Sequence, residues 1–297
     1  MVAVRIGRRL RVGRCSVMMR TCGVGRSWRP ARQGRGRKEG RRLDQRVPDG
    51  QARAEGAADL DKSAFIPQLF DRIADHYDRM NLIMTAGIWR RWQAAFRRRC
   101  GVPAGAQVVD IGCGPAELRL LLADLVGRDG RVSGVDLSER MLEVGRRKVD
   151  ASPHRDRVRL QRGDALDLPF EDGSFDAAAS AFVMRNVADL DRALAEIVRV
   201  VRPGGRVAIL ELSHPPASVV RVPYLLYFRH VLPQLGRWAA RAGLPVAPYA
   251  WLPLSLQTFP GAEAMAQRMA QVGMDEVHFH RLTAGIVCLH TARIAQR

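Results

Sequence analysis

The segment that most constrains the fold runs from Val108 to Glu117 and has the sequence VVDIGCGPAE. A β-branched run that contains one acid leads into a glycine turn and then into helix-forming residues. This order predicts a strand, a tight loop and a helix N-terminus, the place where an open α/β sheet binds a nucleotide-like cofactor. Gly112 and Gly114 matter because a side chain at either position would keep the backbone away from a ligand.

The loop differs from a dinucleotide-binding loop in one respect. Glu117 occupies the position of the third glycine in G-x-G-x-x-G. An acid at this helix N-terminus would repel a pyrophosphate, so the loop favours a cationic nucleoside. S-adenosyl-L-methionine is the candidate cofactor. On the loop alone, glycines that only form a turn remain the alternative.

Stretches with strand and helix periodicity alternate after this loop. Strands are predicted at Val108–Ile111, Val132–Asp136, Val158–Gln161, Ala177–Phe182 and Val207–Ser213, and helices at Glu117–Val126, Glu139–Val149 and Leu190–Val201. Such alternation implies right-handed crossovers and a parallel sheet covered on both faces. The segments Glu276–Leu282 and Gly285–Ile294 suggest an antiparallel hairpin at the edge. The predicted fold is therefore α/β and doubly wound, with a Rossmann-like, mostly parallel sheet.

The flanking segments define the predicted domain organisation. Residues 1–59 are expected to be a disordered Arg-rich tail and residues 60–297 one catalytic domain. Residues 60–100 have helical periodicity and form an N-terminal helical cap. Residues 215–260 are predicted as a helical insertion over the substrate site. Its apolar stripes are those of a helix packed on the sheet, or of a lid or membrane-surface face for a greasy substrate.

The positive charge of the chain is concentrated in its tail. The first 55 residues hold 16 of the 48 Lys and Arg residues and only 4 of the 30 Asp and Glu residues. Because all but three basic residues are arginine, a GC-rich coding sequence explains the bias as well as a selected patch does. No specific nucleic acid is therefore expected as a partner. The tail has four interpretations: an upstream start-codon artefact or inert tail, a nucleic-acid arm, a membrane-surface anchor, or a transit peptide.

Cysteine usage and hydropathy point to the cytoplasm. The five cysteines form no C-x-x-C pair and have no histidine at metal-ligand spacing, so neither a zinc site nor a disulfide framework is expected. No apolar run of about 18 residues is present, and no secretory signal is visible.

Two acids after the glycine loop complete a cofactor site. Asp136 ends the second predicted strand, where a carboxylate accepts hydrogen bonds from both ribose hydroxyls. Leu137 and Met141 provide an apolar bed for an adenine ring, although Met141 as plain core is the alternative. Asp164 and Ala165 follow the third strand and suit the adenine amino group. Together these motifs have the layout of class I S-adenosylmethionine-dependent methyltransferases.

Further blocks narrow the resemblance. The chain resembles the ubiquinone/menaquinone-biosynthesis C-methyltransferase family from about residue 70 to residue 294, in the blocks Tyr77–Asn81, Phe182–Val187, Leu210–Ser213, Ser255–Pro260 and Leu282–Val287. The resemblance implies C-methylation of a polyprenyl quinol, either a demethylmenaquinol or its ubiquinone-pathway equivalent.

The resemblance also implies site residues, where the positions match. The implied cofactor-binding residues are Gly112, Gly114, Pro115, Asp136, Leu137, Asp164, Ala165 and Ala181. Some positions depart from the family pattern. Pro115 replaces a threonine, Ala181 replaces a frequent serine, and Val183-Met184 replaces Gly-Leu. These departures remove hydroxyl contacts and narrow the loop and pocket.

Arg185, Asn186 and Tyr77 are the candidate catalytic residues. A quinol carbon becomes nucleophilic when a neighbouring hydroxyl, with a pKa near 10, loses its proton. Arginine is too basic to take that proton directly. We therefore expect Arg185 to stabilise the phenolate or to polarise a water, while Asn186 and Tyr77 orient the ring. The alternative is that Arg185 only holds a surface carboxylate. His76 is a further candidate for the base.

Two other functions stay open on the sequence. One is a methyltransferase of the same fold that acts on another small phenolic or lipid acceptor, as the Val183-Met184 departure suggests. The other is a binding module without activity that uses the basic tail. The expected partners are a lipophilic quinol, the inner face of a membrane through peripheral contact, and a second copy of the chain in a homodimer. The sequence does not distinguish a benzoquinol from a naphthoquinol.

Overall fold

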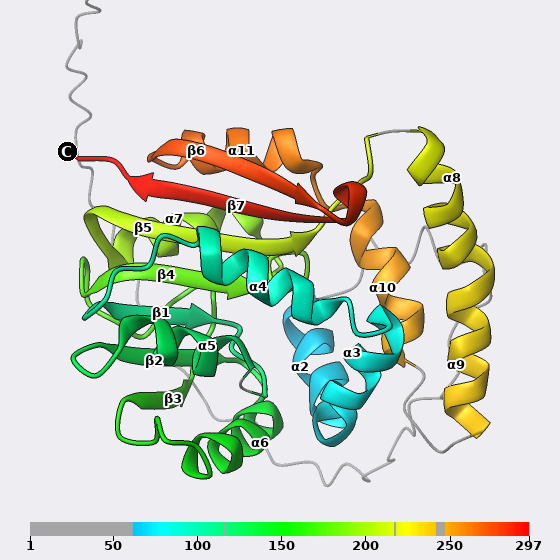
Figure 1. Cartoon of the computed structure of the whole chain (residues 1–297), viewed down its shortest axis with the longest axis horizontal. Coiled ribbons are helices and arrows are strands. Elements are labelled where there is room, and N and C mark those ends of the chain that lie inside the picture. Colours follow the sequence, from blue (N-terminus) through cyan, green and yellow to red (C-terminus); the bar gives the residue numbers. More distant parts are fainter. Residues whose placement is uncertain (1–61, 116, 217, 242–246, 297) are drawn as a thin grey trace, which may run out of the picture. The chain divides into compact units, whose positions relative to one another are not determined.

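The computed structural model describes residues 62–115, 117–216, 218–241 and 247–296 (Figure 1). The predicted tail, residues 1–59, lies outside the described residues.

A seven-stranded sheet in the order β3-β2-β1-β4-β5-β7-β6 forms the centre of the domain. The strands are β1 (Gln107–Ile111), β2 (Arg131–Asp136), β3 (Val158–Arg162), β4 (Phe175–Ala181), β5 (Val201–Leu212), β6 (Met274–Leu282) and β7 (Val287–Ile294). Strands β1 to β5 pair in parallel, and β7 runs antiparallel to both β5 and β6. This confirms the predicted doubly wound sheet with an antiparallel edge hairpin.

Four helices accompany the strands: α5 (Glu117–Val126), α6 (Glu139–Asp150), α7 (Leu190–Val200) and α11 (Ala262–Gln271). Sequence-encoded caps start two of them. The Ser138 hydroxyl accepts a hydrogen bond from the backbone N–H of Met141, and Asp189 caps α7 in the same way. Such caps stabilise a helix by about 1 kcal/mol. The cap at Ser138 places the start of α6 directly after Asp136.

The core lies on both faces of the sheet. Val108 belongs to the cluster on the α4 and α5 side, and its neighbour Val109 to the cluster that contains residues of α7 and α11. Because consecutive strand residues point to opposite faces, a strand buried on both sides has an unbroken apolar run. Asp110 interrupts that run although it is itself buried.

The start of β5 differs from the prediction. The sequence predicts a helix that ends at Val201 and a strand that begins at Val207. In the structure the strand already begins at Val201, and its pairing jumps from Phe175 with Val201 to Ala177 with Arg206. The extra residues form an irregularity in which Gly204 has a φ of 76°. The Pro-Gly-Gly sequence therefore accommodates a bulge within the strand.

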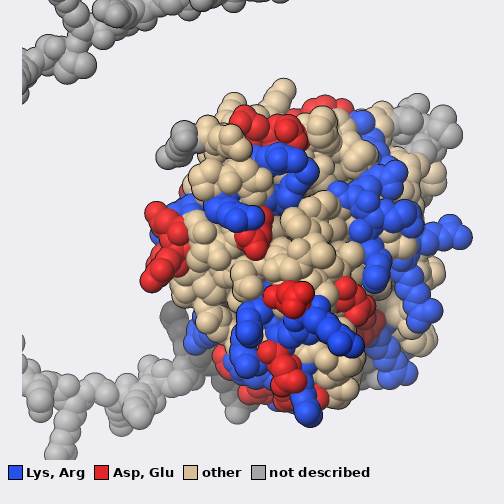
Figure 2. Space-filling model, turned by 60° about the vertical axis from the view of Figure 1, so that its left-hand side comes forward, with Lys and Arg blue, Asp and Glu red and all other residues tan. Residues whose placement is uncertain are grey.

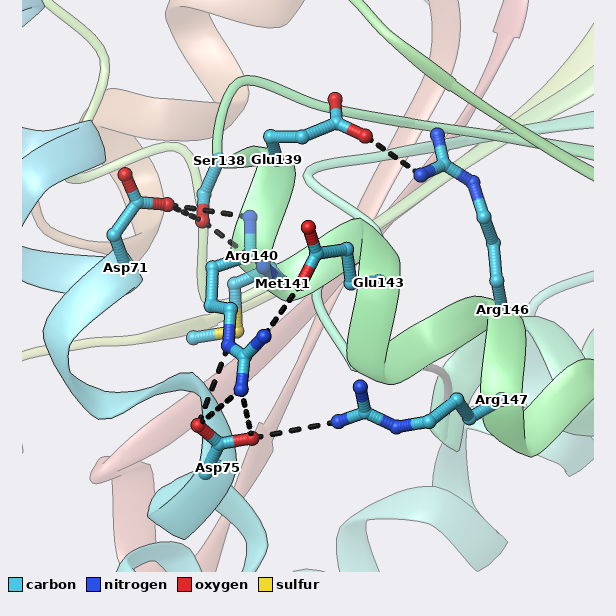
Figure 3. A network of polar contacts seen from close by, with 9 residues as sticks. All are labelled: Asp71, Asp75, Ser138, Glu139, Arg140, Met141, Glu143, Arg146 and Arg147. Carbon is cyan, nitrogen blue, oxygen red and sulfur yellow. Dashed lines mark hydrogen bonds and ion pairs between the residues drawn. The ribbon is translucent and has the colours of Figure 1, made fainter.

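The N-terminal helices are α2 (Lys62–Ile73), η1 (Ala74–His76), α3 (Tyr77–Thr85) and α4 (Trp89–Arg99). Helix α4 buries Trp92 and Phe96 in the core. Helix α2 and turn η1 are bound to α6 by polar contacts (Figure 3). Asp71 accepts from the Ser138 hydroxyl at 2.5 Å, and Asp75 pairs with Arg140 at 2.8 Å. These contacts hold helix α2 and turn η1 against the N-terminus of α6, which lies shortly after Asp136.

The segment between β5 and α11 is helical, with α8 (Ser218–Leu226), the π-helical turn η2 (Tyr227–Val231), α9 (Leu232–Arg241) and α10 (Ala247–Gln257). Between β6 and β7 lies the short turn η3 (Thr283–Gly285). Figure 1 shows α2, α3 and α10 beyond the carboxyl ends of the parallel strands, with α8 and α9 further out. The Tyr227 hydroxyl donates to the Met84 carbonyl at 3.0 Å and links η2 to α3.

Candidate active site

Two cavities meet at the carboxyl edge of the parallel strands. The first has a volume of about 110 Å³ and lies between the glycine loop, the end of β2, the turn after β3 and helix α2. The second has a volume of about 470 Å³ and is bounded by α3, α4, α8 and η2. Both are lined by Tyr77, Gly112, Gly114, Ala181 and Phe182. A ligand in each cavity would therefore meet the other at these residues.

The glycine loop separates the two cavities. Gly112 and Gly114 have φ angles of 66° and 50°, in the left-handed region that favours glycine. A Cβ atom on Gly112 would lie 2.2 Å from a methyl carbon of Val183. The N–H groups of Gly112 and Cys113 donate to the Val135 carbonyl at 2.8 and 2.9 Å. The loop is thus wrapped around the end of β2 and needs glycine for its conformation and, at Gly112, for space.

Asp136 lies at the wall of the first cavity. Its carboxylate accepts hydrogen bonds from the N–H of Gly114 at 2.8 Å and of Ser138 at 2.9 Å, one at each oxygen. A carboxylate has about four acceptor sites, so each oxygen keeps capacity for a sugar hydroxyl. Burial raises the pKa of Asp136, while these N–H groups and the Arg119 charge act in the opposite direction.

The other end of the first cavity suits a purine ring. Asp164, Ala165, Leu137 and Met141 all line it. One Asp164 oxygen accepts from the Leu166 N–H at 2.9 Å. Met141 is only 1% exposed and also belongs to a core cluster with α2 residues. The two interpretations of Met141, adenine bed and core, therefore apply to the same side chain.

The first cavity is lined by every cofactor residue of the prediction except one. Pro115 lines the second cavity instead.

Asp110 is a site residue that the sequence analysis did not identify. It is 1% exposed, lines the second cavity, and neither of its carboxylate oxygens has a hydrogen-bond partner among the described residues. Burial raises its pKa to about 7, an effect that the Arg119 charge opposes. A buried carboxylate without partners is costly, and a cationic ligand group would satisfy it. The feature of the sequence that could have identified Asp110 is the presence of an acid inside an otherwise apolar strand.

Arg185 lies in the wall of the second cavity. Its Nη1 donates to the Glu211 carboxylate at 2.6 Å and to the Phe182 carbonyl at 2.7 Å, and its Nε has no partner among the described residues. The Glu211 side chain is 1% exposed. The carboxylate that Arg185 holds is therefore buried, unlike the surface carboxylate of the alternative interpretation. The ion pair fixes the guanidinium at the cavity.

Asn186 and Tyr77 also lie at the two cavities, but in different ways. Asn186 lines the first cavity, and its Oδ1 accepts from the Trp251 indole N–H of α10 at 2.9 Å. Tyr77 lines both cavities, and burial raises the pKa of its phenol. His76 is exposed and belongs to the lining of neither cavity.

Aromatic side chains form much of the wall of the second cavity. Phe182 contacts the rings of Trp89 and Trp92 with centroid separations of 5.7 and 5.8 Å. The Trp92 indole donates to the Thr283 hydroxyl at 2.7 Å, and the Trp89 indole donates to Glu117. From the sequence, both tryptophans are only apolar positions of a helix. Their role in the wall depends on the tertiary position of α4.

A doubly wound sheet with this glycine loop, an acid at the end of β2 and a second cavity joined at the loop defines a class I S-adenosylmethionine-dependent methyltransferase. The profile of the ubiE/COQ5 methyltransferase family matches residues 58–293. The chain belongs to this family.

Its relatives include two enzymes named demethylmenaquinone methyltransferase. The enzyme of Symbiobacterium thermophilum is 40% identical over 232 residues, which cover 77% of this chain and 92% of that protein. The enzyme of Bacillus cereus strain B4264 is 38% identical over 229 residues, covering 77% of this chain and 95% of the relative.

Solved structures show the same fold at low sequence identity. The cyclase SpnF superposes with a TM-score of 0.59 at 17% identity, over 79% of this chain and 97% of that one. A SAM-dependent methyltransferase from Thermotoga maritima gives a TM-score of 0.53 at 20% identity, over 76% of this chain and 98% of its own. Since one of the two is named a cyclase, the fold alone does not determine the reaction.

Proposed function

We propose that the protein methylates a ring carbon of a demethylmenaquinol, with S-adenosylmethionine as the methyl donor. The observation that carries the proposal is the junction of two cavities at the glycine loop, one suited to a nucleoside and one large and aromatic. The names of the relatives support the naphthoquinol acceptor.

The residues of the first cavity fit the donor. Asp136 would bind the ribose hydroxyls, and Asp164 with Ala165 would bind the adenine. Asp110 lines the second cavity with Gly112 and Gly114, which belong to both cavities; it is a buried carboxylate without a hydrogen-bond partner among the described residues and would bind the ammonium group of the methionine part. When bound, the donor supplies an electrophilic methyl group on a sulfonium centre.

The second cavity would hold the quinol ring, and its residues would prepare the ring for reaction. The positive charge of Arg185 favours ionisation of a ring hydroxyl and so makes the adjacent carbon nucleophilic. Glu211 keeps that guanidinium in place. Tyr77, at the junction of the cavities, would orient the ring. Asn186 holds Trp251 of α10 over the site, so its contribution is positional.

Another phenolic or lipid acceptor is the second candidate function. The two residues that suggest it, Val183 and Met184, do not lie at the cavity proposed for the acceptor. Val183 lines the first cavity and Met184 is 1% exposed in the core, and neither lines the second cavity. Their departure from the family pattern therefore puts neither side chain in the wall of the second cavity.

The helices that bound the second cavity also expose an apolar surface, which we propose contacts the membrane that holds the quinol. Among the described residues, no helix combines the length and the hydrophobicity needed to cross a bilayer. Five large side chains of α8, η2 and α9 are nevertheless 45% to 58% exposed: Val222, Leu225, Leu226, Val231 and Trp238.

The charges of this segment support contact with an anionic membrane. No Asp or Glu occurs between Glu211 and Glu263, whereas this segment contains four arginines. Of these, Arg229, Arg237 and Arg241 are exposed. Apolar side chains together with arginines favour adsorption to anionic lipid. Elsewhere the charges are mixed: on the face shown in Figure 2, acidic groups lie among the basic ones, apart from a band of Lys and Arg on the right.

The acceptor is tested by incubating the purified protein with labelled S-adenosylmethionine and a series of demethylmenaquinol, demethylated benzoquinol and simple catechol. We expect rapid label transfer to the demethylmenaquinol and slow transfer to the catechol. Faster transfer to the catechol would contradict the proposal.

Sedimentation with anionic and zwitterionic vesicles tests the membrane surface. Leu225→Glu should reduce binding to anionic vesicles, while Ala270→Glu on the exposed face of α11 should not. If the surface instead mediates the predicted homodimer, Leu225→Glu will change the mass measured by light scattering without vesicles.

A further inference from the structure

Arg119 of α5 is a buried cation that the mechanism above does not use. It is 0% exposed, and its Nη1 donates to the carbonyls of Cys113 at 3.1 Å and Gly114 at 3.0 Å. Its Nε and Nη2 are buried without a hydrogen-bond partner among the described residues. An arginine is seldom buried without strong compensation, so its surroundings must supply the compensation.

Helix α6 provides the space for this guanidinium. A Cβ atom on Gly145 would lie 2.1 Å from Nη2 of Arg119 and 3.1 Å from its Cζ. Glycine is unfavourable inside a helix compared with alanine, and Gly145 lies in the middle of α6. The pairing of a glycine on one helix with a buried arginine on the next therefore indicates a specific arrangement.

The compensating charges belong to the cofactor site. The titratable groups that interact with Arg119 are Asp110 on β1, Cys113 in the loop and Asp136 at the end of β2. The position of α6 that faces the guanidinium is Gly145, and burial and the Asp136 charge raise the pKa of the Tyr77 phenol of α3. Burial raises the pKa of both carboxyls, and the charge on Arg119 lowers it. Each carboxylate also disfavours ionisation of the other.

We propose that Arg119 is a positioning residue for S-adenosylmethionine: its buried guanidinium holds the Cys113 and Gly114 carbonyls on the α5 side of the loop and supplies positive charge to the Asp110 and Asp136 carboxyls. The inference rests on the proposed function, which assigns both carboxylates to the cofactor. Arg119 lines neither cavity, so it acts through these groups and not by contact with the ligand.

The test is calorimetric titration of the full chain with S-adenosylmethionine from about pH 5.5 to about pH 9. In the wild type, affinity should fall as the pH decreases through the pKa of Asp110, about 7. Arg119→Met should move this profile to higher pH by about one unit, which is an affinity loss of about 5-fold at pH 7 and about 10-fold at pH 5.5 that narrows toward pH 9. Arg119→Lys keeps the charge and should restore the position of the profile.

A purely structural role predicts a different result. In that case Arg119→Met would weaken binding by the same factor at every pH, and this outcome would overturn the proposal. If the wild type itself binds no S-adenosylmethionine, the proposed function fails. If the wild type binds S-adenosylmethionine normally and Arg119→Met weakens binding by the same factor at every pH, only the inference about Arg119 fails.

A second measurement decides the question if Arg119→Met does not fold. Gly145→Ala keeps Arg119 in the chain but places a Cβ atom 2.1 Å from its Nη2, so it should displace the guanidinium and move the binding profile to higher pH. A loss of affinity by the same factor at every pH would then refute the proposed role of Arg119.

Discussion

Replacement of Asp110 by asparagine should have opposite effects on the free and the cofactor-bound protein. Because burial raises the pKa of Asp110 in the folded protein from 3.8 to about 7, the folded state holds a proton that the unfolded state has lost. This group therefore reduces the stability of the cofactor-free protein as the pH rises from about 4 to about 7. The loss is complete above that range.

The rise of this pKa from 3.8 to about 7 lowers the free energy of unfolding by about 4 kcal/mol at alkaline pH. Asparagine avoids this loss, but its own buried amide lacks partners and costs about 1–3 kcal/mol at every pH. We thus expect Asp110→Asn to raise the free energy of unfolding by about 2 kcal/mol at pH 8, which raises Tm by about 4–8 °C for a domain of this size. At pH 4.5 the variant should be no more stable than the wild type. At pH 8 its affinity for S-adenosylmethionine should nevertheless fall by at least about 10-fold, because the ammonium loses its carboxylate.

Thermal unfolding of the cofactor-free protein, followed by circular dichroism between pH 4.5 and pH 8.5, measures the first effect. Asp129→Asn changes an exposed aspartate and is the matched control, with a Tm near that of the wild type throughout. A difference in Tm between Asp110→Asn and the wild type that does not vary with pH would refute the reasoning.

Three further predictions concern other parts of the site. Arg185→Met combined with Glu211→Gln removes the pair without leaving a buried charge; cofactor binding should persist while methyl transfer falls by about 100-fold or more, and normal turnover would exclude Arg185 from catalysis. Asp71→Ala removes the contact of α2 with the start of α6 and should weaken cofactor binding several-fold in calorimetry, whereas Asp191→Ala, remote on α7, should not. Deletion of residues 1–55 should leave the transfer rate unchanged in the labelled-donor assay, because the family match begins at residue 58; loss of transfer would show that the tail is essential.

The features that could be predicted from the sequence are those determined by local chemistry. The glycine loop and Asp136 follow from short patterns, since a left-handed turn needs glycine and a strand end fixes the direction of the next side chain. The cap at Ser138 is equally local. These three features define the first cavity, and the structure places them as the patterns indicate.

The remaining features depend on contacts between distant segments. Glu211 is a partner of Arg185 because β5 lies beside β4, and Trp251 of α10 reaches Asn186 in the turn after β4. Arg119 has the sequence context of a surface arginine, and only the glycine of α6 opposite it makes burial feasible. No local pattern carries such information, because these side chains are defined by what faces them.

The contacts between α2 and α6 have a consequence for turnover. Lys62, Ile66 and Phe70 of α2 line the first cavity, so outward movement of this helix would widen the route by which the spent donor leaves. The Asp75–Arg140 pair is 48% and 42% exposed, and such pairs contribute less than about 1 kcal/mol and are weakened by salt. Where departure of the demethylated donor limits the cycle, added electrolyte should therefore accelerate the enzyme until affinity for the fresh donor becomes limiting.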